Sequence, residues 1–163
     1  MSPPTPPPPE STPDRATGAP FKETYVLEYS YKRSTGPVVG EFLGGLVEGQ
    51  ILGARTASGR VIVPPTEYDP DTGDELRNLV PVASTGAVVS WAWIEEPRPG
   101  QPLPHAFAWA LIRLEGADTA LLHAVDAGQA SKMSTGMRVR VRWRAERIGE
   151  MGDIVCFDPE DAS

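Results

Sequence analysis

The sequence predicts a mainly β protein, in which a five-stranded barrel follows a short helix and a region of short hairpins. Two observations carry this prediction. From Gly86 onward, apolar residues recur at every second position, which is the period of a strand with one buried face. Turn residues separate five such runs at the spacing of a small, partly open Greek-key barrel.

The N-terminal residues differ in composition from the rest. Residues 1–20 contain eight of the 18 prolines, which favours polyproline II and predicts a disordered arm that cannot build a core. A plain tail is the simpler interpretation, and a ligand for an SH3-type domain is the alternative. Residues 24–31 are rich in aromatic and β-branched residues, and their periodicity fits a strand or a helix.

Composition narrows the class of protein. A single cysteine, Cys156, excludes an intramolecular disulfide and fits a reducing cytosol, and its apolar neighbours predict a buried structural thiol. The pattern of a secretory signal and that of a bilayer span are both missing, so we expect a soluble, cytoplasmic protein with no membrane partner. A formal charge of −7 argues against nucleic-acid binding. Twelve arginines against three lysines favour a GC-rich, actinobacterial genome.

The segment 21–83 should contain a helix and short hairpins. Within 38–48 apolar residues recur at helical spacing, although Gly44 and Gly45 cost about 1 kcal/mol each, so this helix should depend on docking. Its stripe, with Phe42 and Leu46, faces either the core or a partner protein. Residues 51–54 and 60–63 predict a hairpin.

Residues 69–73 (D-P-D-T-G) predict a tight turn that needs no metal. The Gly and Glu positions of a calcium-binding EF-hand loop are missing from this register.

The barrel domain is expected at 84–158, followed by an acidic tail at 159–163. Its five predicted strands span 87–95, 106–114, 119–125, 137–146 and 153–157. Four prolines between 97 and 104 make a stiff connection, and Glu115 to Asp118 form a hairpin turn. The segment 126–136 is the connection in which such a barrel carries a helix or loop.

The sequence shows no catalytic constellation. His105 and His123 are isolated, and Glu95 and Glu96 point to opposite faces of a strand. The sequence has no nucleophile beside a base, no phosphate-binding loop and no cysteine cluster. We therefore predict that the chain is not an enzyme on its own.

Two features suggest a binding surface. Alternate residues of one strand carry arginines on one face: Arg138, Arg140, Arg142 and Arg144. This arginine strip is either a solvated exterior that discourages edge pairing or a contact for an acidic partner surface, CoA phosphates or single-stranded nucleic acid. Trp91 and Trp93 share a face of another strand, and both core packing and a partner surface remain open for them.

The segment from Arg55 to Gly73, R-T-A-S-G-R-V-I-V-P-P-T-E-Y-D-P-D-T-G, resembles a zinc ribbon that has lost its cysteines. The former ligand positions of its two knuckles are occupied by Thr56, Ser58, Asp69 and Thr72.

The order of the pieces resembles one family across about residues 38–158. These pieces are the helix-like lead F-L-G-G-L-V-E-G-Q-I-L-G-A-R, then G-R-V-I-V-P-P, the D-P-x-x-G knuckle and S-T-G-M-R-V before the fourth barrel strand. The family is that of acyl-CoA-associated OB-fold proteins with an N-terminal rubredoxin-like zinc ribbon.

The resemblance implies a function. Members of this family act beside thiolase-like or lipid-transfer-protein-like subunits in condensation or retro-aldol chemistry on acyl-CoA thioesters, including steroid side-chain breakdown. This implies a non-catalytic accessory subunit in a heterotetramer, with acyl-CoA at the shared interface and no cofactor held by this chain alone. The alternatives are a single-stranded nucleic-acid-binding OB domain and a free-standing acyl-CoA-binding protein.

Loss of the cysteines predicts a protein without zinc. Hydroxyl and carboxylate groups at these four positions cannot replace the four thiolates of a structural zinc site, whose ligation supplies roughly 10–16 kcal/mol in small modules. Elemental analysis of untagged protein should find far less than one zinc per chain. Stoichiometric zinc would contradict the prediction.

Overall fold

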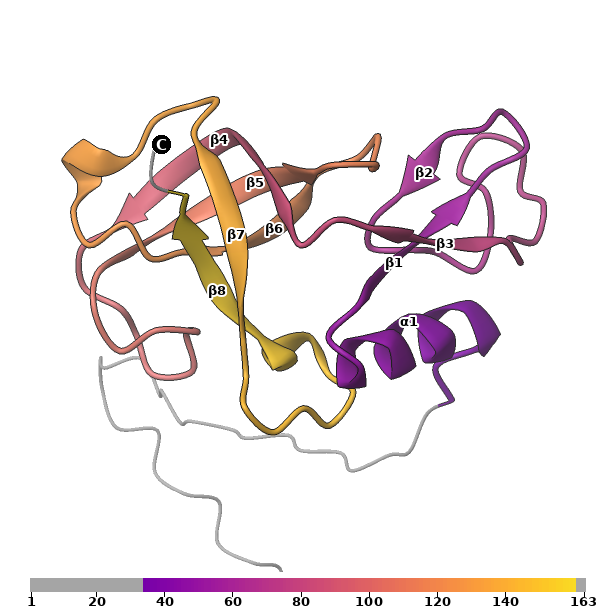
Figure 1. Cartoon of the computed structure of the whole chain (residues 1–163), viewed down its shortest axis with the longest axis horizontal. Coiled ribbons are helices and arrows are strands. Elements are labelled where there is room, and N and C mark those ends of the chain that lie inside the picture. The colour runs from indigo at the N-terminus through magenta and orange to yellow at the C-terminus, as the bar shows by residue number, and fades with distance from the viewer. Residues whose placement is uncertain (1–33, 161–163) are drawn as a thin grey trace, which may run out of the picture. The chain divides into compact units, whose positions relative to one another are not determined.

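The computed structural model describes residues 34–160, which form one compact unit. The predicted proline-rich arm, the segment 24–31 and residues 161–163 lie outside the described residues. Figure 1 shows one helix, α1 (Pro37–Val47), a small sheet of β1 (Ile51–Arg55), β2 (Val61–Ile62) and β3 (Leu79–Val82), and a barrel. The barrel strands are β4 (Thr85–Ile94), β5 (Phe107–Leu114), β6 (Leu121–Val125), β7 (Arg138–Trp143) and β8 (Ile154–Pro159). The predicted fold class is confirmed.

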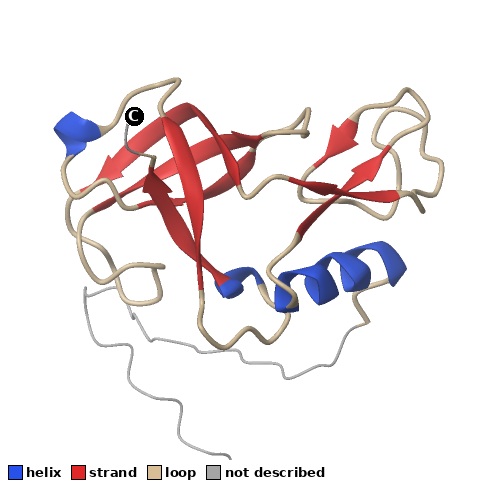
Figure 2. Ribbon diagram, in the orientation of Figure 1, coloured by secondary structure: helices blue, strands red, loops and turns tan. Residues whose placement is uncertain are grey.

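The barrel has the strand order of an OB fold. Its five strands close in the order β4-β5-β6-β8-β7. Figure 2 shows the strands of the barrel in red. Neighbouring strands are antiparallel except β6 and β8, which run parallel and pair only at Val125 and Phe157. Two short 3-10 turns, η1 (Ala130–Lys132) and η2 (Met151–Asp153), lie in the connections before β7 and β8.

Alternation along β5 separates two apolar clusters. Ala108, Ala110 and Ile112 point into the barrel, whereas Phe107 lies on the outside with Trp109. The rings of Phe107 and Trp109 meet edge to face at 5.4 Å, and Leu103 from the proline-rich connection covers Phe107. Trp109 therefore lies outside the barrel, because its strand position has the opposite parity from the inward alanines.

Helix α1 begins at Pro37, whose missing N–H suits the first helical position. The carboxylate of Glu67, 28 residues away from Val39, accepts the N–H groups of Val38 (3.3 Å) and Val39 (2.9 Å) and so caps the helix. Phe42 and Leu46 then join the cluster that fills the barrel, which supplies the docking that the two glycines require.

The small sheet has the order β2-β1-β3, and β3 was missed from the sequence. Its four residues include Pro81, which weakens the strand signal. Gly53 of β1 is required by packing, because a Cβ atom there would lie 2.5 Å from Cγ1 of Val61.

The turn between β5 and β6 binds β2 and the following Val63 through side-chain and backbone hydrogen bonds. Oδ2 of Asp118 accepts the N–H of Val61 (2.8 Å), and the N–H of Asp118 donates to the Val61 carbonyl (2.8 Å). Oγ1 of Thr119 accepts the N–H of Val63 (2.7 Å) and donates to its carbonyl (2.9 Å). These groups take the place of a fourth strand at the outer edge of the small sheet (Figure 1), and we call them the edge clamp.

We expect Thr119→Val to weaken the fold measurably. The change keeps the shape of the side chain but leaves the N–H and carbonyl of Val63 without their partner, which should cost about 1–3 kcal/mol of unfolding free energy. Chemical denaturation would measure this. The exposed Thr135, changed to Val, is the matched control and should alter the unfolding free energy by less than about 0.5 kcal/mol. Equal values for the two variants would contradict the role of the clamp.

Candidate functional site

The segment 55–73, whose sequence resembles a zinc ribbon, is held by its own hydrogen bonds at both turns that correspond to knuckles. Oγ1 of the buried Thr56 accepts the N–H of Arg60 (3.1 Å) and lies 2.9 Å from Oγ of Ser58. Oδ1 of the buried Asp69 accepts the N–H of Asp71 (2.9 Å).

Thr72 is the fourth residue that the resemblance aligns with a zinc ligand, and its hydroxyl donates to Asp74 (2.9 Å). An ion pair between Arg60 and Asp71 (2.7 Å) joins the two knuckles. A set of three hydroxyls and one carboxylate does not suit zinc, which prefers thiolate and imidazole ligands. The absence of zinc stays a prediction.

Asp126, Cys156 and Asp158 place one potential metal-ligand atom each within 4.8 Å of one another. The guanidinium of Arg142 already binds both carboxylates of this cluster. Nη1 of Arg142 lies 3.1 Å from Asp126, and Arg142 also binds Asp158 through Nε (3.0 Å) and Nη2. These contacts, chiefly the hydrogen bond to Asp158, raise the pKa of Arg142 above its ordinary value. Burial raises the pKa of the Cys156 thiol to about 12. At neutral pH this sulfur is protonated and is neither a good ligand nor a nucleophile.

All four arginines of the arginine strip are paired with acids of the same chain. Arg138 contacts Glu115 (2.5 Å) and Glu160 (3.2 Å), Arg140 contacts Glu160 (3.1 Å), and Arg144 contacts Glu150 (2.6 Å). The strip is therefore a neutralised surface rather than a free cationic one. Arg140 is the most accessible member, with 64% of its side chain exposed. A contact of the strip with a partner or CoA stays a prediction.

The register of the β7–β8 hairpin explains this pairing. Arg140 lies opposite Asp158 and Arg142 opposite Cys156, so the outward positions of β8 and the residues after it place carboxylates beside the strip. The acidic residues Asp158 and Glu160 were not recognised as part of the site. Their two-residue spacing, which matches that of the arginines, was the available signal.

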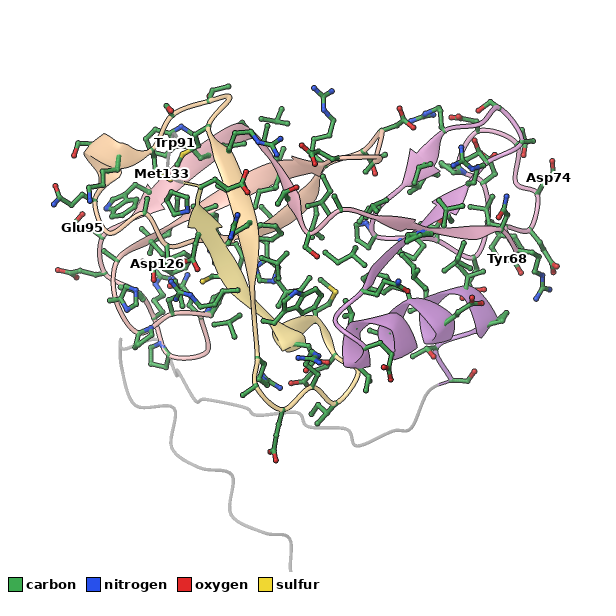
Figure 3. All side chains as sticks on the ribbon, viewed as in Figure 1. Tyr68, Asp74, Trp91, Glu95, Asp126 and Met133 are labelled. Atoms are coloured by element: carbon green, nitrogen blue, oxygen red, sulfur yellow. The ribbon has the colours of Figure 1, made fainter. Side chains whose placement is uncertain are left out.

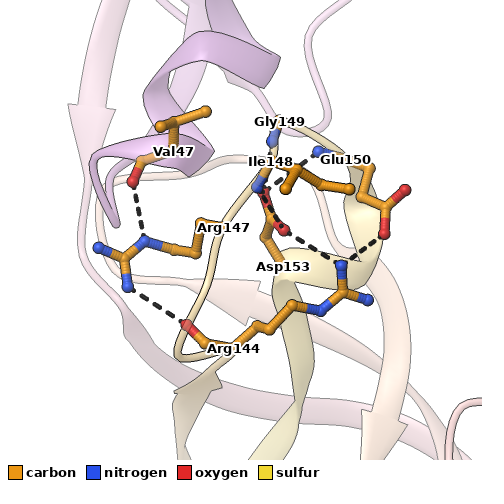
Figure 4. Close-up of polar contacts among 7 residues, drawn as sticks. All are labelled: Val47, Arg144, Arg147, Ile148, Gly149, Glu150 and Asp153. Carbon is orange, nitrogen blue, oxygen red and sulfur yellow. Dashed lines mark hydrogen bonds and ion pairs between the residues drawn. The ribbon is translucent and has the colours of Figure 1, made fainter.

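A second polar centre fixes the loop between β7 and β8 (Figure 4). The Asp153 carboxylate accepts the N–H groups of Ile148 (3.1 Å), Gly149 (2.7 Å) and Glu150 (3.2 Å) and lies 3.5 Å from Arg144. Burial alone would raise the pKa of Asp153, but these amides and Arg144 outweigh it and hold the pKa below its ordinary value.

The same loop is joined to α1 by Arg147. Its Nε donates to the carbonyl of Val47 (2.8 Å), so a cation lies at the C-terminal end of the helix (Figure 4).

The four apolar residues that the sequence offered as core or partner surface differ in their burial. Phe42 and Leu46 are 2% and 0% exposed, so they form core and do not present a partner surface in the described part of the chain. Trp91 and Trp93 are half-buried and pack against the interior cluster. Figure 3 shows Trp91 near Met133 at one end of the barrel. Nε1 of Trp93 donates to Glu95 (2.7 Å).

The two histidines lie in different surroundings. His123 is buried beside Phe157, with ring centroids 5.8 Å apart, and burial lowers its pKa, so the ring is neutral at neutral pH. His105 is half-exposed, and its Nε2 lies 3.2 Å from the carboxylate of Asp126 (Figure 3). Within residues 34–160 neither histidine has a hydrogen bond to a hydroxyl or thiol that it could activate.

The strand order and the closed barrel define the class: this is an OB-fold protein with a helix and a small sheet before the barrel. Residues 79–144 match the family model described as the ChsH2 C-terminal OB-fold domain. The resemblance to acyl-CoA-associated OB-fold proteins is thereby confirmed.

Two solved structures share the fold. A protein of unknown function from the DUF35 family of Sulfolobus solfataricus has a TM-score of 0.53 and 24% identity, over 66% of this chain and 77% of that one. A chain of the Ltp2–ChsH2(DUF35) aldolase has a TM-score of 0.57 and 19% identity, over 78% of this chain and 98% of that one. The comparison with curated proteins gave no match. None of the helices in the described residues is long and apolar enough to span a membrane.

Arg140 and Arg142 should respond differently to substitution. Arg142→Gln removes the partner of Asp126 and Asp158 and should cost about 1–2 kcal/mol of unfolding free energy, less than a fully buried pair because Arg142 is partly exposed. Arg140→Gln should cost less than about 0.5 kcal/mol, because this exposed side chain has one contact. Urea denaturation distinguishes the two, and equal losses would contradict the assignment.

The depressed pKa of Asp153 predicts acid-dependent stability. A carboxylate whose folded pKa lies below its unfolded pKa stabilises the fold fully above about pH 5, and the stabilisation is lost as pH falls through the folded pKa. Asp153→Asn should lower the Tm at pH 7 by on the order of 5 °C. The gap from the wild type should shrink as pH falls below about 4. Glu96→Gln, an exposed carboxylate, is the control, and a gap independent of pH would contradict the prediction.

Proposed function

We propose that this chain is an accessory subunit that docks on a thiolase-like, lipid-transfer-protein-type subunit and helps to form its acyl-CoA site. The match of residues 79–144 to the ChsH2 C-terminal OB-fold domain carries this proposal. The fold of the described residues, which is shared with a chain of the Ltp2–ChsH2(DUF35) aldolase, supports it. The reaction that we propose for the complex is condensation or retro-aldol cleavage of an acyl-CoA thioester, with steroid side-chain degradation as the particular setting.

The chemistry of the described residues supports a role without catalysis by this chain. Two groups that could take part in covalent or acid–base chemistry are poorly suited to it: the Cys156 thiol is buried and protonated, and His123 is buried and neutral. Three of the hollows lined by described residues have volumes of about 180, 280 and 330 Å³. Pockets for drug-sized ligands are about 300–1,000 Å³ and acyl-CoA is larger, so these volumes favour a site shared with a partner over a free-standing acyl-CoA-binding protein.

The nucleic-acid alternative receives less support. Single-stranded nucleic acid needs a cationic groove, and each arginine of the strip already has a carboxylate of this chain as its partner.

Co-expression tests the proposal. Tagged chain would be co-expressed with each thiolase-like subunit of the source genome, and the mass of the purified complex would be measured by native mass spectrometry. We expect a heterotetramer of two copies of each subunit. The complex should split a β-hydroxyacyl-CoA into a carbonyl compound and a shorter acyl-CoA, with neither subunit active alone. A chain that stays alone in the presence of every such subunit would refute the accessory role.

A further inference from the structure

The outer face of β5 and β6 carries an exposed apolar patch. Leu111 and Leu122 are direct cross-strand partners and are 39% and 58% exposed. Val89, also exposed, lies at the bulge of β4 beside Ser90, which pairs with Leu111. Single exposed apolar residues are ordinary on a protein surface, but neighbours on three adjacent strands form one patch, and such patches mark interaction sites.

An arginine that has no acidic partner in the described part of the chain continues this patch. Alternation along β5 places Trp109 and Arg113 on the same face as Leu111, because each is two residues away from it along the strand. We call Val89, Trp109, Leu111, Arg113 and Leu122 the β5–β6 face. Among residues 34–160 no carboxylate pairs with Arg113, whereas every arginine of β7 has one. A guanidinium beside exposed leucines is suited to bind a carboxylate of another molecule.

The chemistry of the face selects its occupant. Nucleic acid would need several cations and several exposed stacking rings, whereas this face offers one cation, three aliphatic side chains and one half-buried ring, that of Trp109, which packs against Phe107. A second copy would bring the same residues of both chains together across a two-fold axis. The β5–β6 face contains no acid, so Arg113 would find no counter-charge there. The complementary surface is therefore that of a different protein, apolar and with a carboxylate opposite Arg113.

We propose that the β5–β6 face is the surface on which the thiolase-like subunit docks, with apolar partner residues on Leu111 and Leu122 and a partner carboxylate on Arg113. This assignment rests on the proposed function. β5 and β6 are the second and third strands of the barrel, and the face of these strands is the one that OB folds commonly use for ligands.

A double variant tests the apolar part of the face. The probe is the thiolase-like subunit that co-purifies with the wild-type chain, and affinity is measured by titration calorimetry. Leu111→Glu combined with Leu122→Glu should weaken the Kd by about 100-fold or more, because two central contacts become buried unpaired charges. Ile148→Glu is the matched control, since Ile148 is 68% exposed but lies in the β7–β8 loop, and its Kd should stay within about threefold. Circular dichroism and Tm would confirm that the variants fold.

Charge reversal tests the polar part. Arg113→Glu should weaken the Kd by about tenfold or more, and the variant should lose much of the salt dependence that wild-type binding shows. Wild-type affinity retained by the double leucine variant would overturn the assignment while leaving the proposed function intact. A wild-type homodimer that Leu122→Glu dissociates would assign the face to a second copy and would also overturn it. A wild-type chain that binds none of the thiolase-like subunits would instead refute the proposed function, and this assignment with it.

Discussion

The turn between β5 and β6 joins the two parts of the fold, because Asp118 and Thr119 bind the edge of β2 as a neighbouring strand would. The small sheet has three strands and β2 only two residues, too little to be stable by itself. Two further contacts act in the same direction. Phe42 and Leu46 of α1 enter the cluster that fills the barrel, and Arg147 of the β7–β8 loop binds the end of the helix.

This arrangement gives a physical account of how a segment that resembles a zinc ribbon is held together without four thiolates. In a small isolated module the metal supplies the folding free energy. Here Val61 and Val63 are buried in the common cluster, and the knuckles are closed by hydrogen bonds to Thr56 and Asp69. Packing against the barrel and turn hydrogen bonds stabilise this segment instead.

Charge is distributed unevenly between the faces of the barrel. The outer face of β7 concentrates arginines, yet β8 and the loops beside it supply carboxylates to all of them, which makes this face a poor attractant for anions. The outer face of β5 has a single arginine, but no carboxylate in the described residues neutralises it. A cation that is unpaired among residues 34–160 and lies next to two exposed leucines is therefore a stronger indication of a partner surface than four paired arginines.

Much of the fold was determined by the sequence itself, because alternation and turn residues are local signals. The barrel strands were predicted to within a few residues, and α1 was predicted from its apolar spacing. β3 was missed because four residues with a proline carry little local signal. The sequence of β5 does not show which of its alternate residues face the barrel interior, because Phe107 and Trp109 are as apolar as the inward alanines. Phe107 and Trp109 can lie on the outer face because Leu103 covers them there.

The site depended more on tertiary structure. The sequence placed Arg138, Arg140, Arg142 and Arg144 on one face, but only the β7–β8 register showed that Asp158 and Glu160 neutralise them. The sequence likewise gave no reason to single out Leu111, Leu122 or Arg113. Whether a side chain on a barrel faces solvent, and whether a charge has a partner, depends on strands that are distant in the chain and become neighbours only when the barrel closes.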